Sequence, residues 1–325
     1  MKCLGCYKEG KVSYCLECRK LLFNGLKISS VLPFDPPNNE NIAFFQSYSH
    51  RFSISGVQLK YSLKLENKEL LLTGSNGHYI LKPVPQGKQF AHLESIPENE
   101  HLTMQIARQV FKIAVAANAL IHFQDGTPAY ITKRFDVRQN GGKYQQEDFA
   151  QLSGKTSDTH GDHFKYEGSY ADIGKLIHQF VPASIPATEN FFKLVAFNYM
   201  LSNGDAHLKN FSLIRNDEGE YQLSPAYDLL SSIIHSPGES DTALQLFDKD
   251  HETPFFSKFG YYGRMDFLEL ANHINIMPQR AERILQHFVS KKDKVVHMIN
   301  QSFLNDEIKA IYLKNFQDKL GRFTS

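Results

Sequence analysis

Three oxygen-bearing side chains have the types and spacing that phosphoryl transfer requires. Asp205 stands five residues ahead of Asn210, and Asp228 follows further along the chain. A carboxylate can accept the proton of an incoming hydroxyl, while an amide oxygen and a second carboxylate can hold Mg²⁺ on a nucleotide. We therefore predict that Asp205 is the catalytic base, that Asn210 and Asp228 are magnesium ligands, and that the reaction is ATP-dependent phosphorylation.

Two further residues lie inside this segment. His207 is expected to brace the loop or orient Asp205 by hydrogen bonding, although a buried histidine without a chemical role fits the sequence equally well. Lys209 is a candidate for contact with the transferred phosphoryl group, and an exposed lysine is its alternative. A lone Asp or Asn in a loop is usually a cap or turn residue. The offset from Asp205 to Asn210 nevertheless matches the D-x-x-x-x-N spacing of phosphoryl-transfer loops, which favours catalysis.

The nucleotide phosphates need a cationic anchor, and Lys82 is the candidate. It ends an apolar stretch, Tyr79-Ile80-Leu81-Lys82-Pro83, that predicts a strand closed by proline. Glu100 begins the next predicted helix and is expected to pair with Lys82, fixing the direction of the lysine. A solvated lysine at a strand end is the alternative.

The remaining nucleotide contacts are assigned to a loop and a later strand. Ser53-Ile54-Ser55-Gly56-Val57-Gln58 can cradle phosphate through backbone N–H groups, with Gly56, Val57 and Gln58 as the contacts. Its single glycine makes a weak match to a glycine-rich loop. Ser53 and Ser55 are candidate phosphoacceptors, because an added phosphate there would repel a bound triphosphate. We expect the adenine pocket at Lys133 and Phe135, with Tyr227 beside Asp228 completing the site. Core packing of Phe135 is the alternative.

All four cysteines, Cys3, Cys6, Cys15 and Cys18, form two Cys-x-x-Cys turns. Such turns can wrap one tetrahedral Zn²⁺, and a structural zinc clip is the favoured interpretation. Reduced free thiols and a disulfide pair are the alternatives, although a chain without a secretion signal should keep its thiols reduced. The first 30 residues carry six basic and two acidic side chains, so a knuckle that binds nucleic acid is also considered.

Bulk composition restricts the class of protein. The chain has 325 residues, with 42% hydrophobic and 22% charged, which is ordinary for a globular protein. The formal net charge of +1 gives no overall attraction to nucleic acid or to an anionic membrane. Neither a signal peptide nor an apolar run long enough to span a membrane is apparent. We therefore expect a cytoplasmic protein with no direct DNA specificity and no membrane partner.

Local patterns divide the chain into a β-rich first half and a helical second half. Strands are predicted over 57–65, 79–83 and 129–135, the first two as a hairpin, and a helix over 99–112. Thr188 is expected to cap a helix that ends near residue 201, and later helices are expected at 265–277, 279–300 and 303–318. The predicted fold class is α+β, with two kinase-like lobes. The boundaries are 1–30 for the zinc knuckle, 31–137 for the nucleotide-binding lobe and 138–325 for the helical lobe.

These elements in this order resemble the HipA-like serine/threonine kinases of bacterial toxin–antitoxin systems. The combination of Asp205-x-His207-x-Lys209-Asn210-Phe211 with Pro225-x-Tyr227-Asp228 carries most of the resemblance. The other matching stretches are Ser53 to Gln58, Ile80 to Pro83, Glu100, Lys133 to Asp136 and Gln146 to Phe149. Together they cover about residues 50–235.

What the resemblance implies is a protein kinase that phosphorylates an aminoacyl-tRNA synthetase and arrests translation. It also implies silencing by a DNA-binding antitoxin and by autophosphorylation at Ser53 and Ser55. The longer members carry an extra N-terminal subdomain of about a hundred residues, whereas here about 50 residues precede the loop. The length suits the short, HipT-like members, which receive that subdomain as a separate small protein.

Three other functions compete with this one. A small-molecule phosphotransferase shares the catalytic geometry. A metal-dependent phosphohydrolase would use His160, Asp162, His163, Asp205 and His207 around two metals, but it leaves Lys82 and Asn210 without roles. A nucleotide-binding module without turnover would usually lack one of the residues that this chain retains.

Overall fold

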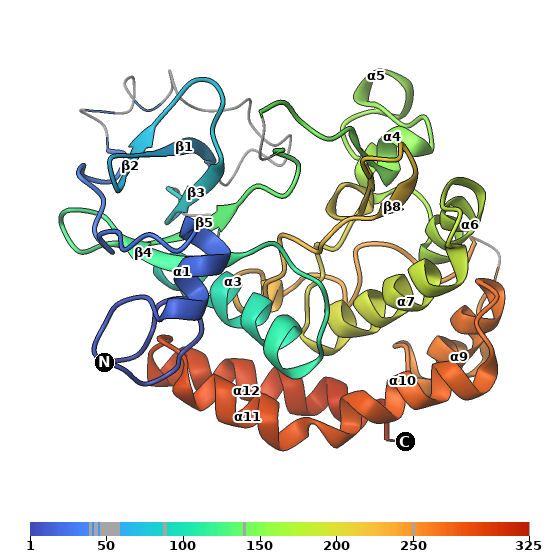
Figure 1. Cartoon of the computed structure of the whole chain (residues 1–325). Coiled ribbons are helices and arrows are strands. Elements are labelled where there is room, and N and C mark those ends of the chain that lie inside the picture. The colour runs from blue at the N-terminus through green and yellow to red at the C-terminus, as the bar shows by residue number, and fades with distance from the viewer. Residues whose placement is uncertain are drawn as a thin grey trace.

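The computed structural model describes residues 1–38, 41, 45, 59–86, 90–138, 141–248 and 251–324. The chain folds into a sheet-containing part and a larger helical part, which lie side by side in Figure 1. We call them the sheet lobe, which contains β1 to β5 and α3, and the helical lobe, which contains α6 to α12. The predicted α+β, two-lobed, kinase-like fold class is confirmed. The loop Ser53 to Gln58, with its five predicted site residues, lies outside the described residues.

The sheet lobe is built on five antiparallel strands in the order β2-β1-β3-β5-β4. Their bounds are β1 Tyr61–Glu66, β2 Glu69–Leu72, β3 Tyr79–Pro83, β4 Asn118–His122 and β5 Pro128–Lys133. β3 is the central strand, with Leu81 opposite Tyr61 on one side and Ile131 on the other. Pro83 ends the strand, in agreement with the prediction, because proline has no N–H to continue the ladder.

Helix α3 (Ile96–Gln105) crosses the sheet and continues into a π-helical turn, η2 (Ile106–Val110). Proline in the first turn of α3 is tolerated because the N–H that it lacks has no partner there. Almost every residue of α3 is buried, including the polar Asn99, Glu100 and His101. α3 is therefore an interior helix whose polar residues must find partners inside the protein.

The helical lobe is organised around α7 (Ser184–Met200), which packs against α6 (Tyr170–Phe180) and α12 (Asp306–Gly321). Around it lie α8 (Pro254–Phe259), α9 (Arg264–His273), α10 (Pro278–Ser290) and α11 (Lys292–Gln301). α11 and α12 run along the bottom of Figure 1, below α1 and α3. α11 contacts η2, so it supports the continuous helix formed by α3 and η2, against which the sheet packs.

A second, three-stranded sheet lies beside α7. Its antiparallel strands are β6 (Gln146–Asp148), β7 (Ser212–Arg215) and β8 (Tyr221–Leu223), in that order. The short helices α4 (Phe149–Leu152) and α5 (Ser157–His160) follow β6, and each begins with a capping box. Three 3₁₀ turns complete this region: η3 (Phe164–Tyr166), η4 (Leu208–Asn210) and η5 (Ser232–Ile234). These strands and turns border the segment that carries Asp205.

The N-terminal segment, residues 1–30, contains α1 (Leu16–Phe23) and packs into the sheet lobe. Cys3, Leu4, Cys18 and Phe23 belong to the same buried cluster as Leu63 and Leu81 of the sheet. A second, larger cluster fills the helical lobe and includes α3 residues such as Leu102 and Met104. The two clusters meet along α3.

Several sequence-based expectations about elements are wrong. Thr188 does not cap a helix, because α7 already begins at Ser184 and Pro186 fits in its first turn. Thr188 lies within α7 and donates its hydroxyl to Ser184 O. The helix expected over 279–300 is two helices separated at Lys291, which lets α10 pack on α7 and α11 on η2. β1 and β3 pair antiparallel as expected, but they do not form a hairpin, because Glu69–Leu72 between them forms β2, which pairs with β1 on its other side.

Among the residues that the structure describes, no helix is long and apolar enough to cross a lipid bilayer.

Gly174 of α6 offers a test of the packing between α6 and α9. A Cβ at this position would lie 2.2 Å from Cγ2 of Ile274, which is fully buried. We expect Gly174→Ala to lower the free energy of unfolding by about 1–3 kcal/mol, the usual cost of overpacking. Chemical denaturation would measure this change.

The control is Gly321→Ala at the end of α12, where nothing lies within 4 Å of the added Cβ. Alanine loses less backbone entropy than glycine in a helix, so this variant should be neutral or stabilised by up to about 1 kcal/mol. Equal stability of the two variants would contradict the packing of α6 on Ile274.

Candidate active site

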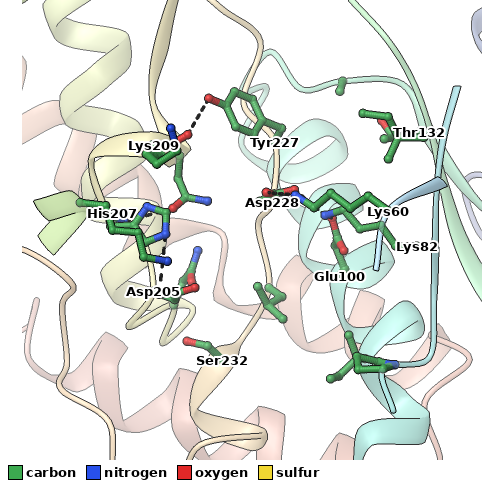
Figure 2. A pocket seen from close by; sticks show the side chains of 18 of the residues that line it. Lys60, Lys82, Glu100, Thr132, Asp205, His207, Lys209, Tyr227, Asp228 and Ser232 are labelled. Atoms are coloured by element: carbon green, nitrogen blue, oxygen red, sulfur yellow. Dashed lines mark hydrogen bonds and ion pairs between the residues drawn. The ribbon is translucent and has the colours of Figure 1, made fainter. Parts of the chain in front are cut away.

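A cavity of about 970 Å³ lies between the two lobes. It is lined by every predicted nucleotide-binding and catalytic residue in the part of the chain that the structure describes. These are Lys82, Glu100, Lys133, Phe135, Asp205, His207, Lys209, Asn210, Tyr227 and Asp228. Figure 2 shows Lys82 and Glu100 on one side of the cavity, Asp205 and His207 on the other, and Asp228 between them.

The centre of the cavity is an ion cluster around Lys82. Its Nζ lies 2.6 Å from Glu100 Oε1 and also bonds to Asp228 Oδ1. Only 4% of the Lys82 side chain and 2% of the Glu100 side chain are exposed. The expected pairing of Lys82 with Glu100 is therefore present, and the same ammonium group also bonds to the carboxylate of Asp228 in the helical lobe.

The charges in this cluster stabilise one another. Burial lowers the pKa of Lys82, but the carboxylates of Asp228 and Glu100 outweigh it and hold that pKa above its usual value. Burial likewise raises the pKa of Asp228, yet Lys60 and Lys82 more than offset it and keep the pKa well below normal. For Glu100, burial dominates and raises the pKa despite Lys82. Asp228 is thus an ionised carboxylate at neutral pH.

Asp228 is presented by an unusual backbone. Its φ is +55°, in the left-handed region that costs energy for a residue with a Cβ. Just before it, Ala226 forms a parallel bridge with Val115, in which its N–H donates to Ala114 O and its carbonyl accepts from Ala116. The segment that links η2 to β4 therefore holds Asp228 in place. These backbone contacts fasten the helical lobe directly to the base of the sheet lobe.

Asp205 follows α7 in a turn before η4. Tyr166 donates its hydroxyl to Asp205 Oδ1 at 2.7 Å, and 46% of the Asp205 side chain remains exposed. Partial burial raises the pKa of this carboxyl above its ordinary value, which suits a proton acceptor. The preceding Gly204 is confined, because a Cβ there would lie 2.4 Å from Ser240 O. The turn therefore holds the carboxylate toward the cavity.

The other residues of this segment support the turn. His207 Nε2 lies 4.0 Å from Asp205 Oδ1, and burial lowers the pKa of His207 to about 3, so the ring is neutral. The backbone N–H of His207 donates to Asn210 Oδ1 at 3.2 Å. Lys209 forms an ion pair with Asp148 Oδ2 at 2.7 Å, and its carbonyl accepts a bond from the Tyr227 hydroxyl. Lys209 is thus already oriented by a carboxylate at the cavity wall.

The predicted adenine residues lie on the same cavity. Phe135 and Tyr227 approach with ring centroids 5.8 Å apart, one from each lobe. The N–H groups of Lys133 and Arg134 donate to Ala117 O and His78 O respectively, so these donors belong to the sheet lobe itself. The Lys133 ammonium bonds to Asn24 of the N-terminal segment.

Sequence reasoning missed three functional candidates. Lys60, just before β1, bonds to Asp228 Oδ2 at 3.0 Å and adds a second cation to the site. Tyr166 bonds to Asp205, and Asp148 bonds to Lys209. Lys60 lies in the predicted strand over 57–65 and Asp148 in the matching stretch Gln146 to Phe149, so the sequence offered a signal for both residues. Tyr166 ends η3, and no local sequence pattern indicates that this turn approaches Asp205.

The residues expected for a two-metal hydrolase form no metal-ligand cluster in the described ranges, although Asp162, His163, Asp205 and His207 line the same cavity. Two groups of three or more His, Cys, Asp or Glu ligands lie close enough in the described ranges to share an ion. One is the four cysteines, and the other is His251, Glu269 and His273. Neither includes His160, Asp162, His163, Asp205 or His207, so the phosphohydrolase alternative lacks its metal centre in this part of the chain.

Fold and cavity together define a class. A twisted sheet lobe carries a lysine on its central strand, paired with a glutamate on the adjoining helix. A helical lobe supplies an Asp-x-x-x-x-Asn turn and a second aspartate across a cavity. This is the architecture of kinase-like phosphotransferases.

Comparison with known proteins narrows the class to one family. Residues 52–296 match the family model described as the HipA-like C-terminal domain, and the chain belongs to the HipA-like kinase family. The matched range includes every predicted catalytic and nucleotide-binding residue and excludes the cysteines.

Similar proteins are named as kinases. A Haemophilus influenzae protein named "Putative kinase" is 27% identical over 331 residues, which cover 96% of this chain and 93% of the relative. A "Putative kinase" of Sinorhizobium fredii is 34% identical over 69% of this chain and 55% of its own length. The serine/threonine-protein kinase toxin HipA of Shewanella oneidensis is 25% identical over 83% of this chain and 62% of its own length.

Two solved structures share the fold. The HipA of Shewanella oneidensis, in a complex with HipB and operator DNA, aligns with a TM-score of 0.62 at 20% identity. That alignment covers 90% of this chain and 72% of the other. The Helicobacter pylori proinflammatory kinase CtkA aligns with a TM-score of 0.52 at 15% identity, over 82% of this chain and 90% of the other.

Lys82 is the residue whose removal should disturb the site most. In Lys82→Met, two carboxylates lose their shared buried cation, so we expect a loss of about 3–5 kcal/mol in unfolding free energy at neutral pH. Glu100 can relieve this by holding a proton more tightly than in the unfolded chain. The deficit should therefore grow as pH rises and shrink on acidification.

Lys60→Met provides the matched control, because Lys60 contacts the same carboxylate but has 31% of its side chain exposed. Its loss should cost about 1 kcal/mol or less. Urea denaturation of both variants over a range of pH would measure these effects. Equal, pH-independent losses would argue against a buried cluster centred on Lys82.

Proposed function

We propose that this protein is an ATP-dependent serine/threonine protein kinase. The observation that carries the proposal is the cavity that joins the Lys82–Glu100–Asp228 cluster to the Asp205 turn. Each residue type there has a role in phosphoryl transfer, and the membership in a kinase family supports the same reaction.

The donor set at the cavity suits a magnesium nucleotide. Asn210 offers an amide oxygen and Asp228 an ionised carboxylate, and Mg²⁺ prefers oxygen ligands of these kinds. Lys60 and Lys82 supply positive charge beside Asp228 for the phosphates. When bound, Mg²⁺-ATP supplies the phosphoryl group and the metal neutralises developing charge. Gly56, Val57 and Gln58 are proposed as backbone contacts to the phosphates, and Phe135 and Tyr227 as contacts to the base.

Asp205 is proposed to receive the proton of the acceptor hydroxyl. Its carboxylate is exposed enough for a substrate to reach and has a pKa raised by partial burial. The Tyr166 hydroxyl now bonds to Oδ1, which leaves Oδ2 for the acceptor or requires the tyrosine to move. His207 and Asn210 fix the turn, and Lys209 provides charge at its edge.

The physiological role is proposed from the family. We propose a toxin-type kinase whose acceptor is a protein, with an aminoacyl-tRNA synthetase as the expected class of target and translational arrest as the outcome. The Shewanella oneidensis relative is complexed with HipB and operator DNA, which supports a DNA-binding antitoxin as a partner here. A small separate N-subdomain-like protein is a second proposed partner. Mass spectrometry of a bacterial lysate incubated with the protein and ATP would identify the acceptor.

Loss of the two carboxylates tests the catalytic roles. We expect Asp205→Asn to lower phosphate incorporation from labelled ATP by about 10²–10⁴-fold, since it removes the proton acceptor but retains the shape. Asp228→Asn should also abolish labelling, because it removes a metal ligand and a partner of Lys82.

Asp318→Asn is the matched control, because Asp318 is exposed on α12, away from the cavity. Circular dichroism and thermal melting should show that all three variants remain folded. Undiminished labelling by a folded Asp205→Asn variant would remove the base assignment. Labelling of small molecules but not of any protein would favour a small-molecule phosphotransferase.

Autophosphorylation is proposed at Ser53 and Ser55. Because a phosphate in this loop would repel the nucleotide phosphates, the Ser53→Ala, Ser55→Ala double variant should lose most self-labelling and stay active for longer. Phosphopeptide mapping after incubation with ATP measures this. Ser325, outside the described residues, and Ser13, in the N-terminal segment, provide serine-to-alanine controls. Persistent self-labelling of the double variant would exclude both serines as the main acceptors.

A further inference from the structure

The four cysteines form a compact cluster away from the active-site cavity. Their sulfur atoms all lie within 4.8 Å of one another, and Cys6 Sγ and Cys15 Sγ are 3.7 Å apart. A tetrahedral site with Zn–S bonds of about 2.3 Å places its sulfurs about 3.8 Å apart. All four are free thiols in the structure, so the spacing is that of a metal site and not of two disulfides.

The backbone around the cluster has the form of a metal knuckle. Cys6 N and Tyr7 N both donate to Cys3 O, which closes a tight turn between the first two cysteines. Gly5 within this turn is required, because a Cβ there would lie 2.8 Å from Cys18 Sγ. The N–H of Cys15 donates to Cys3 Sγ at 3.2 Å, and Cys15 and Cys18 stand at the start of α1, where the helix dipole favours negative charge.

This segment covers the free edge of the sheet. β4 is an edge strand, and the N–H of its Leu120 donates to Leu4 O at 3.0 Å. The carbonyl of the same residue accepts the Tyr14 hydroxyl at 2.7 Å. Leu4 lies between Cys3 and Cys6, so a residue of the knuckle itself pairs with the strand.

The same segment also contacts the helix that carries Glu100. Tyr7 packs on His101 with ring centroids 5.1 Å apart, and His101 is the residue after Glu100. Gln109 of η2 donates to Cys6 O at 3.2 Å. His101 in turn bonds to Asn118 of β4 at 3.0 Å, so the knuckle, α3 and β4 form one closed set of contacts.

We propose that the four cysteines bind one Zn²⁺, and that this zinc knuckle braces α3 and β4 so that Glu100 is held against Lys82. Zinc is the ion that suits four thiolates without redox chemistry, and iron is the competing ion for such a set. Loss of the ion would separate the two Cys-x-x-Cys turns. The contacts that Leu4, Cys6 and Tyr7 make with β4, η2 and α3 would then be lost. The consequence for phosphoryl transfer rests on the proposed kinase function, whereas zinc binding and bracing do not.

The first experiment measures metal content and local opening in the full chain. We expect one zinc atom per chain by mass spectrometry of the purified protein. Removal of zinc by a chelator should accelerate hydrogen exchange at Leu120 and across α3, while α10, which is remote from the knuckle, should be unchanged. Iron in place of zinc, no bound metal, or unaltered exchange at α3 and β4 would overturn the proposal.

Two variants separate binding from bracing. Cys6→Ser with Cys15→Ser, the two less buried cysteines, should lose the zinc and exchange rapidly at α3 and β4. Tyr7→Leu should retain one zinc atom but still accelerate exchange at α3, because it removes only the contact with His101. Lys2→Ala, which loses a bond to Gln301 O in α11, is the control and should resemble the wild type. Slow exchange at α3 in a zinc-free variant would show that the metal does not brace the helix.

A nucleotide-binding measurement connects the knuckle to the active site. If Glu100 is released, ATP affinity should fall on the order of fivefold or more, within the usual range of coupling between sites. Chelation that changes exchange at α3 but not ATP affinity would overturn the link to Glu100 and leave the zinc site intact. Failure of ATP to bind the zinc-loaded protein would count instead against the proposed kinase function.

Discussion

The arrangement of the whole protein depends on one buried ammonium group. Lys82 lies on the central strand of the sheet lobe and contacts carboxylates from two other elements, Glu100 of α3 and Asp228 of the helical lobe. A buried charge without partners is very unfavourable, so both carboxylates must stay within reach of it. The relative position of strand, helix and opposing lobe is thereby restricted. The left-handed backbone of Asp228 is a local cost of meeting that restriction.

This constraint explains why α3 is so polar inside the protein. One side of the helix faces Lys82 through Glu100, another bonds through Asn99 to Ser231 and His235 of the helical lobe, and a third meets β4 through His101 and Asn118. Each bond satisfies a buried polar group and also fixes the rotation of the helix about its axis. An apolar helix could bury the same surface but would not be held at one rotation. The polar residues therefore determine the direction in which Glu100 points.

The sequence predicted those parts of the fold whose signals are local. The strand at 79–83 has the predicted bounds because proline ends it. Asp205 and Asn210 both line the cavity, as the spacing of these two residues in the sequence indicated. The helix expected over 279–300 was wrong at Lys291, since tertiary packing and not local pattern divides α10 from α11. The contact of Tyr166 with Asp205 joins segments 39 residues apart, and no period or motif encodes such a contact.

The sheet lobe needs support that its own strands do not provide. Its buried cluster draws Cys3, Leu4, Tyr14, Cys18 and neighbouring residues from the N-terminal segment, while α3 contributes mainly to the larger cluster of the helical lobe. Five short strands have only a small core of their own, and small cores are usually reinforced by a metal or a disulfide. The segment that carries the cysteines lies against the edge strand β4 and beside the residue that follows Glu100, where a bound metal would reinforce both. One N-terminal segment therefore completes the core of the sheet lobe and also contacts α3 through Tyr7, which links the stability of the sheet lobe to the alignment of Glu100.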